Sequence, residues 1–284
     1  MKKKQIDYYE FPNGTVVKSV WGDGVYRFDS IKKVWEIDYS LTSEFAWDRP
    51  YGEPCLNLRE KVDVCCDLPP FPRESELEVG NVVLIGAYPQ KSAHDFSPIE
   101  WIVLEADGCV ALCISKYCLI TSGYCDPQKA YGKPEMLWWE NSTAREICNH
   151  HFFECAFSEE EKARIVPTTI SEVQFGTQCK DSVFILSEKE VCRYFPTPNQ
   201  RRASPTPYAT QKGAMTDWIS DTEALSPWWV LPEENAYGFA DGSIYPKVVH
   251  YSGSFIFHGR NAYHGDFTIR PCIRIKYAYM PKGM

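Results

Sequence analysis

The sequence predicts an α+β fold, in which a twisted antiparallel sheet is combined with two or three helices, long loops and a small N-terminal β-meander. In the main part of the chain, β-rich runs come first, two capped helices follow, and irregular strands between polar loops come last. This order is typical of α+β proteins and differs from the strand–helix alternation of a parallel sheet. With 284 residues, of which 44% are hydrophobic, the chain is long enough to bury a large core.

Residues 1–45 are predicted to form an antiparallel β module. Short runs at 9–11, 15–20, 25–28 and 34–37 are separated by turn sequences, which include Asn13-Gly14 between the first two and Asp23-Gly24 between the next two. Such dipeptides between alternating runs indicate hairpins. A sheet of three or four strands with one buried face is marginally stable alone, so we expect this module to dock on the main domain or on a partner.

Residues 46–75 are predicted to be a connector, because prolines such as Pro69-Pro70 lie there among charged residues. The α+β domain then covers residues 76–284. It opens with predicted strands at 82–88, 99–105 and 109–115, of which the last two are joined by an Asp107-Gly108 turn.

Two helices are predicted in the middle of this domain, each from a capping signature. Thr143-x-x-Glu146 predicts a helix to about Phe153, and Ser158-x-x-Glu161 predicts one that ends before Pro167. A buried strand at 182–187 leads into a short helix at Glu188. Further strands are expected around 218–219, 228–231, 247–250 and 268–275.

The charge and apolar runs limit the partners and the compartment. A net charge of -8 without a basic stripe argues against nucleic acid and against anionic membranes. No apolar run follows the charged N-terminus, and none reaches the ~18 residues of a transmembrane helix. We therefore expect a cytoplasmic protein whose twelve cysteines stay reduced.

Several motifs follow one another in a fixed order between about Val79 and Ile275. They are Gly86-Ala87-Tyr88-Pro89-Gln90, Pro98-Ile99-Glu100-Trp101, Trp139-Glu140-Asn141-Ser142-Thr143, Asp181-Ser182-Val183-Phe184, Thr206-Pro207-Tyr208-Ala209, Trp228-Trp229 and Arg270-Pro271. The ordered series resembles a bacterial domain-of-unknown-function family that is frequent in Gram-positive gut bacteria. Its double-Trp strand and its closing Arg-Pro strand are similar to those of C-type-lectin-like domains. The resemblance implies a lectin-like fold and no activity.

No motif for catalysis, a metal or a cofactor is found in the sequence. Pro232-Glu233-Glu234-Asn235 has the residues of a lectin calcium triplet in the wrong order. The cysteines form no CxxC pair, and Cys109 and Cys113 would lie about 13 Å apart on a strand, too far to share zinc. Neither hydrolase nor phosphate-loop motifs occur. We predict no catalytic residue, no metal and no cofactor.

The loops from Pro232 to Asp266 are the predicted binding face, because they bring polar and aromatic residues together between strands. In the double tryptophans, alternation predicts that Trp229 and Trp139 lie in the core and that Trp228 or Trp138 can be exposed. The candidate ligand-binding residues are Trp228, Asn235, Tyr237, His258, Arg260, Asn261, Tyr263, His264 and Asp266.

These observations favour a non-catalytic module that recognises a protein, peptide or glycan. The alternative is an enzyme for a small molecule, with His258, His264 or Asp266 as acid–base groups. A third possibility is an interaction scaffold that oligomerises through the N-terminal module. The oligomeric state is left open by the sequence.

Overall fold

The computed structural model describes residues 16–18, 25–29, 34–37, 71–72, 76–126, 138–172, 177–218, 224–231, 246–257 and 262–277. The chain divides into two compact units, Met1–Cys66 and Asp67–Met284. The division falls within the segment that the sequence indicates as a connector.

The described part of the first unit is a three-stranded antiparallel sheet in the order β1-β2-β3. Its strands are β1 (Val16–Lys18), β2 (Val25–Asp29) and β3 (Val34–Ile37). The register pairs Val17 with Tyr26 and Phe28 with Trp35. Three alternating runs thus pair as the sequence predicts, and the predicted Asn-Gly and Asp-Gly turns lie outside the described residues.

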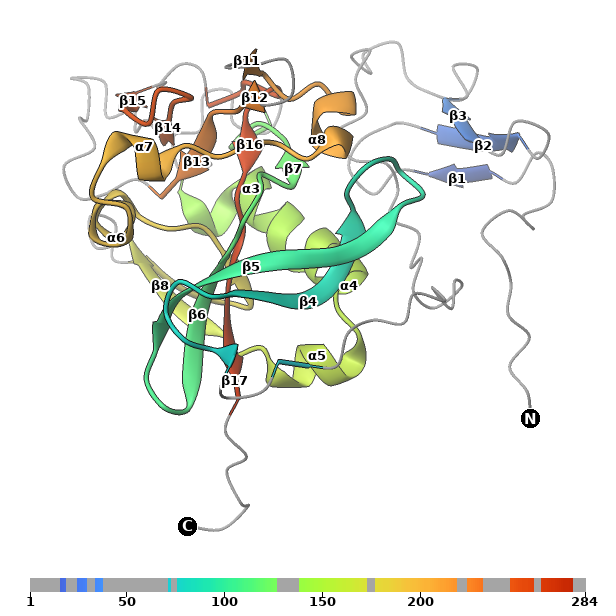
Figure 1. Cartoon of the computed structure of the whole chain (residues 1–284). Helices are drawn as coiled ribbons and strands as arrows, with labels where there is room; N and C mark the ends of the chain where they lie inside the picture. Colours follow the sequence, from blue (N-terminus) through green and yellow to red (C-terminus); the bar gives the residue numbers. More distant parts are fainter. Residues whose placement is uncertain are drawn as a thin grey trace, which may run out of the picture. The chain divides into compact units, whose positions relative to one another are not determined.

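The second unit contains two five-stranded sheets (Figure 1). The first has the order β10-β17-β6-β5-β4 and is antiparallel throughout. Its strands are β4 (Val82–Pro89), β5 (Phe96–Ala106), β6 (Val110–Ser115), β10 (Val183–Phe184) and β17 (Cys272–Lys276). The three strands predicted at the start of the domain therefore form neighbouring strands of one sheet.

The second sheet has the order β15-β14-β13-β16-β7. It contains β7 (Ile120–Thr121), β13 (Trp228–Val230), β14 (Lys247–Val249), β15 (Phe255–Phe257) and β16 (Thr268–Ile269). Only the β13–β16 pair among these is parallel. Two hairpins complete the described strands: β8 (Thr168–Glu172) with β9 (Thr177–Asp181), and β11 (Asp217–Trp218) with β12 (Ala224–Leu225).

The predicted middle helix is a composite. A 3-10 turn η4 (Trp139–Asn141) precedes α3 (Thr143–Glu146), a π-helical segment η5 (Ile147–Phe152) and α4 (Phe153–Ala156). The N-cap of α3 is Ser142, whose hydroxyl accepts from the Arg145 amide, so the predicted cap at Thr143 is one residue late. The predicted capping box of α5 (Glu159–Arg164), between Ser158 and Glu161, is confirmed.

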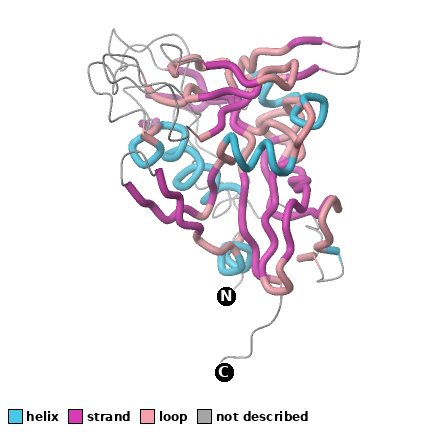
Figure 2. Tube along the Cα trace, turned by 90° about the vertical axis from the view of Figure 1, so that its left-hand side faces the viewer, coloured by secondary structure: helices cyan, strands magenta, loops and turns pink. Residues whose placement is uncertain are grey.

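Three more short helices follow: α6 (Glu188–Tyr194), α7 (Pro198–Arg201) and α8 (Pro207–Gln211). The sequence predicts α6 and misses α7 and α8, each of which has a proline in its first turn. In the side view of Figure 2, the short helices of this unit are distributed among its strands. The mixed α+β class predicted from the sequence is confirmed.

Aromatic side chains fill the core between these elements. Trp101, Trp139, Trp228 and Trp229 are each fully buried. Trp101 contacts the rings of Phe152 and Phe157, with centroids 6.5 and 6.1 Å away, and its indole N–H donates to the Ile85 carbonyl at 2.9 Å. This packing fixes the composite helix against the first sheet.

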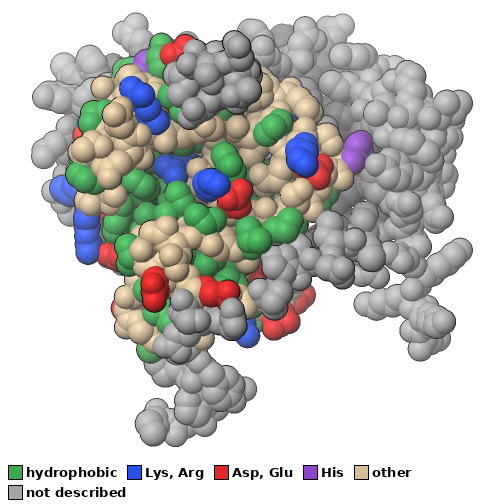
Figure 3. All heavy atoms as spheres, in the orientation of Figure 1, with side chains coloured by type: hydrophobic (Ala, Val, Ile, Leu, Met, Phe, Trp, Pro, Cys, Tyr) green, Lys and Arg blue, Asp and Glu red, His purple; other side chains and the backbone are tan. Residues whose placement is uncertain are grey.

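On the face drawn in Figure 3, lysine and arginine side chains lie beside carboxylates and among hydrophobic side chains. One pair on the first sheet is Lys116 with Glu100, 2.6 Å apart. In the part of the chain that the structure describes, no helix is both long and apolar enough to cross a bilayer.

We predict that Gly86→Ala lowers the free energy of unfolding by about 2–4 kcal/mol. Gly86 has φ 66°, and a Cβ there would lie 2.6 Å from the Ala156 carbonyl oxygen and 2.8 Å from the Phe157 ring. Gly108→Ala is the matched control, because Gly108 has φ 87° and no atom within 4 Å of its Cβ position. It should cost about 1 kcal/mol from backbone strain alone. Equal losses in urea titrations of the two variants would contradict the predicted clash.

Candidate functional site

Of the predicted loops from Pro232 to Asp266, the structure describes residues 246–257, which contain β14 and β15, and residues 262–266. The candidate residues that are described after β15 lie on the segment Ala262–Phe267, which leads into β16. Backbone hydrogen bonds hold it at both ends. The Cys125 amide donates to the Ala262 carbonyl at 3.1 Å, the Met215 amide to the Asp266 carbonyl at 2.6 Å, and the Ser122 amide to the Phe267 carbonyl at 2.9 Å. The segment is therefore fixed to the core although it carries polar side chains.

Successive aromatic ring contacts connect this segment to the core. The His264 ring stacks on Phe267 with centroids 4.8 Å apart and an interplanar angle of 24°. Phe267 contacts Trp229 at 5.1 Å, and Trp229 contacts Tyr124 at 5.7 Å. The indole N–H of Trp229 donates to the Ser122 carbonyl at 2.9 Å. Since Tyr124, Trp229 and Phe267 are buried, the imidazole rests on a rigid base.

His264 and Asp266 form a polar pair at the surface. Nδ1 of His264 and Oδ1 of Asp266 lie 3.1 Å apart, and their side chains are 38% and 29% exposed. A carboxylate at this position favours the tautomer with hydrogen on Nδ1 and holds the ring in one orientation. The pair can bind a polar ligand or act as an oriented base.

Tyr263 adds a phenol beside this pair. Burial raises the pKa of Tyr263 above its ordinary value, and the electrostatic effect of Cys125 acts in the same direction. The hydroxyl consequently stays protonated at neutral pH, where it can both donate and accept a hydrogen bond. Among the predicted ligand-binding residues, the structure brings His264 and Asp266 together, and Tyr263 precedes them on the same segment.

The remaining predicted residues are not part of this group. Asn235, Tyr237, His258, Arg260 and Asn261 lie outside the described residues. Trp228 is described, and its side chain is 0% exposed, so the structure places it in the core and not on a binding face.

Trp228 is buried because other parts of the chain cover the face of β13 on which it lies. With β14 on one side and β16 on the other, β13 buries both of its tryptophans. Trp228 donates its indole N–H to the Arg201 carbonyl at 3.0 Å, and the Arg270 guanidinium lies 5.4 Å from its ring centroid. Alternation predicts opposite directions for the two rings, but it does not predict that both faces are covered.

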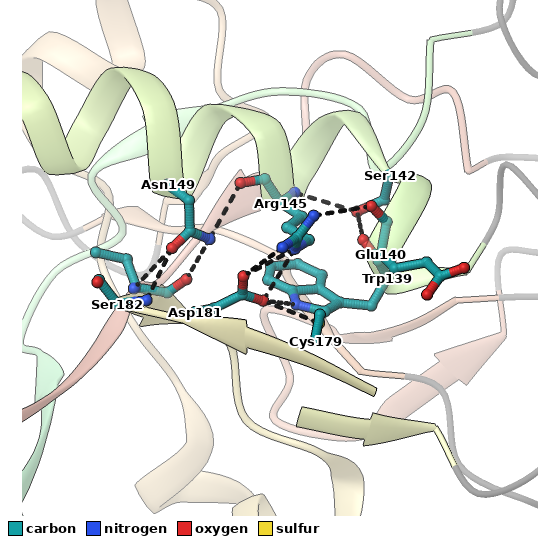
Figure 4. A network of polar contacts seen from close by, with 9 residues as sticks. Trp139, Glu140, Ser142, Arg145, Asn149, Cys179, Asp181 and Ser182 are labelled. Atoms are coloured by element: carbon teal, nitrogen blue, oxygen red, sulfur yellow. Dashed lines mark hydrogen bonds and ion pairs between the residues drawn. The ribbon is translucent and has the colours of Figure 1, made fainter. Parts of the chain in front are cut away.

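The sequence analysis missed a polar network around Asp181, which is drawn in Figure 4. The Asp181 side chain is 1% exposed. Its carboxylate accepts from Nε of Arg145 at 2.8 and 3.0 Å, from the Trp139 indole at 2.7 Å and from the Cys179 thiol at 3.2 Å. In addition, Nη2 of Arg145 lies 2.8 Å from Oδ1 of Asp181. The hydrogen bond with Asp181 is the main reason that the pKa of Arg145 is raised.

Asn149 continues the network from the π-helical segment. Its Oδ1 accepts from the amides of Ser182 and Val183 at 2.9 and 3.1 Å, and its Nδ2 donates to the Val183 carbonyl at 2.8 Å. A side-chain amide thus takes the place of a neighbouring strand at the start of β10 (Figure 4).

Trp139 and Asp181 come from two of the ordered motifs, Trp139–Thr143 and Asp181–Phe184, whereas Arg145, Asn149 and Cys179 lie outside them. The two motifs were the available signal. Both oxygens of the Asp181 carboxylate accept hydrogen bonds from protein donors, so we assign this side chain a structural role.

Four buried thiols are also structural. Burial is the first cause that raises the pKa of Cys113 to about 12 and of Cys118 to about 11, and it raises the pKa values of Cys148 and Cys272 as well. These groups are protonated at neutral pH and are poor nucleophiles. Within the described ranges, no three His, Cys, Asp or Glu side chains are grouped so that they could hold a metal ion.

Comparison with known proteins finds one family. The sequence profile described as "Domain of unknown function (DUF6273)" matches residues 115–277, which is more than half of the chain. Among the ordered motifs, the two near Gly86 and Trp101 precede this match. Neither a curated protein nor a solved structure matches the chain.

We predict that Asp181→Asn lowers the free energy of unfolding by about 3 kcal/mol, because the Arg145 guanidinium loses a buried charged acceptor. In a double-mutant cycle with Arg145→Met, the coupling energy should exceed about 1.5 kcal/mol. Glu105→Gln is the control, since Glu105 pairs with the largely exposed Arg193 and should cost less than about 1 kcal/mol. A coupling energy near zero would show that the Asp181 contact does not stabilise the fold.

We also predict a sharp contrast in thiol reactivity. Cys118, Cys148 and Cys272 are 0% exposed and have raised pKa values, whereas Cys192 is exposed on α6. Iodoacetamide at pH 8 should label Cys192 in the native protein and the three buried thiols only in denaturant. Peptide mass spectrometry measures the labelling, and rapid native labelling of Cys118 would refute the described packing.

Proposed function

From the premise that the chain belongs to the DUF6273 family of domains of unknown function, we propose that it is a non-catalytic recognition module for a protein, peptide or glycan. The binding groups are Tyr263, His264 and Asp266, on the segment that precedes β16. The sequence-predicted residues Asn235, Tyr237, His258, Arg260 and Asn261 complete this face in the proposal.

The observation that carries the proposal is the fixed presentation of the His264–Asp266 pair. The two side chains hold each other at 3.1 Å, and the imidazole stacks on the buried Phe267. The backbone of the same segment bonds to Cys125 and Met215. A ligand that binds side chains already held in place loses less conformational entropy, which favours affinity.

The Asp181 carboxylate and the buried thiols already have structural roles, which supports recognition over catalysis. The carboxylate of Asp181 is occupied by Arg145 and Trp139, and burial keeps four thiols protonated. A reducing, cytoplasmic location is part of the proposal and rests on the sequence. A C-type-lectin-like topology is part of the proposal and rests on the sequence motifs.

A second candidate function is an enzyme that uses the same pair for acid–base chemistry. A carboxylate that orients an imidazole through Nδ1 is a common arrangement for a general base. The 3.1 Å distance between His264 and Asp266 favours it. In that case the ligand would be a small molecule that is converted, and the same residues would control turnover.

We predict that His264→Gln with Asp266→Asn abolishes binding while the fold is retained. The full chain would be labelled and applied to printed glycan and peptide arrays. Signals of the wild-type protein should fall at least tenfold in the double variant, because the oriented polar pair is lost. His250→Gln is the matched control, since His250 is also partly exposed and bonds to a neighbouring side chain, Ser252.

Thermal unfolding of all three proteins checks that the variants fold. Identical array profiles for the wild type and the double variant would overturn the recognition proposal. Turnover of ester, glycoside or phosphate test substrates that His264→Gln abolishes and His250→Gln preserves would favour the enzyme instead.

A further inference from the structure

Arg270 lies where the chain passes from one five-stranded sheet to the other, between β16 and β17. The residue is 3% exposed. An arginine carries its charge at any physiological pH, so its burial requires compensation from neighbouring groups. Arg270 is not one of the binding groups of the proposed function.

The donors of Arg270 are only partly used. Nε donates to the Ser115 carbonyl at 2.8 Å, and Nη2 lies 3.5 Å from the Lys116 carbonyl. Nη1 is buried and has no hydrogen-bond partner. Because a guanidinium has five N–H groups, three of them have no acceptor: the two of Nη1 and the second one of Nη2. One N–H of Nη1 and the free N–H of Nη2 form the distal edge.

Two aromatic rings lie close to the guanidinium. The centroid of Phe195 lies 5.2 Å from its central carbon, and that of Trp228 lies 5.4 Å away. These contacts offset part of the desolvation cost. No carboxylate forms an ion pair with Arg270 among the described residues, and burial lowers its pKa, opposed by the nearby thiols of Cys118 and Cys272.

The orientation of the used donors decides which ligand fits. The two backbone carbonyls lie at the edge formed by Nε and Nη2, and the distal edge formed by Nη1 and Nη2 has no acceptor. This edge is the one that binds a carboxylate through two parallel N–H···O bonds. A neutral acceptor such as water would satisfy hydrogen bonds there and leave the buried charge without a counter-ion.

We propose that the distal edge of Arg270 binds a small carboxylate, which completes the junction between the two sheets. Nη1 is buried, and the ring of Phe195, a residue 9% exposed, lies 5.2 Å from the guanidinium carbon, so entry of the ligand requires Phe195 to move. The carboxylate supplies the negative charge that no described side chain provides to Arg270. Its binding therefore stabilises the folded state.

The test uses the full chain with formate as the probe. Equilibrium dialysis with carbon-14-labelled formate should show one saturable site per chain. At tenfold excess over the dissociation constant, formate should raise the melting temperature by roughly 3–6 °C. Sodium chloride at the same ionic strength separates this effect from screening.

Arg270→Lys retains a charge but lacks the two-pronged edge, and we expect formate to bind at least tenfold more weakly to it. The matched control is Arg193→Lys, on the exposed Arg193, which should bind formate like the wild type. The labelled-formate measurement on the wild type stands even if Arg270→Lys does not fold. Absence of saturable binding to the wild type, or equal binding by a folded Arg270→Lys protein, would overturn the proposal and leave water as the occupant.

Discussion

The buried carboxylate of Asp181 is the contact on which the arrangement of the second unit depends. It lies at the end of β9 and collects donors from the 3-10 turn and from α3 through Trp139 and Arg145. A charge buried to this extent is tolerated only with paired donors, so its position determines where the composite helix begins. Asn149 then fixes the same helix to β10, and the π-helical segment around it places its amide beside that strand.

A second constraint is the double crossing between the two sheets. The chain passes from one sheet to the other twice, between β6 and β7 and between β16 and β17, and the two connections lie side by side. Backbone hydrogen bonds link them on both sides of the crossing: the Ser115 amide donates to the Pro271 carbonyl, and the Leu119 amide donates to the Ile269 carbonyl. Arg270 reaches across the junction to the Ser115 carbonyl. The core is continuous through this junction, from Trp101 in the first sheet to Trp229 in the second.

The candidate binding segment depends on the second of these sheets. Phe267 and Trp229 form the base on which His264 lies, and β16 fixes the direction in which the segment enters the sheet. The sequence predicts the composition of this face, because polar and aromatic residues alternate there without an apolar pattern. It does not predict the pairing of His264 with Asp266, since the geometry of a turn depends on its backbone anchors at Cys125 and Met215.

Local patterns in the sequence determined the class of the fold and most of the elements that have a strong local signal. The Asp-Gly hairpin between β5 and β6 and the capping box at Ser158 are of this kind, because the residues that form them are close in the chain. The tertiary structure alone decided that Trp228 is buried and that Asp181 and Arg270 are internal. Burial of these side chains depends on contacts between residues such as Arg145 and Asp181, or Ser115 and Arg270, which are distant in sequence and have no periodic signal.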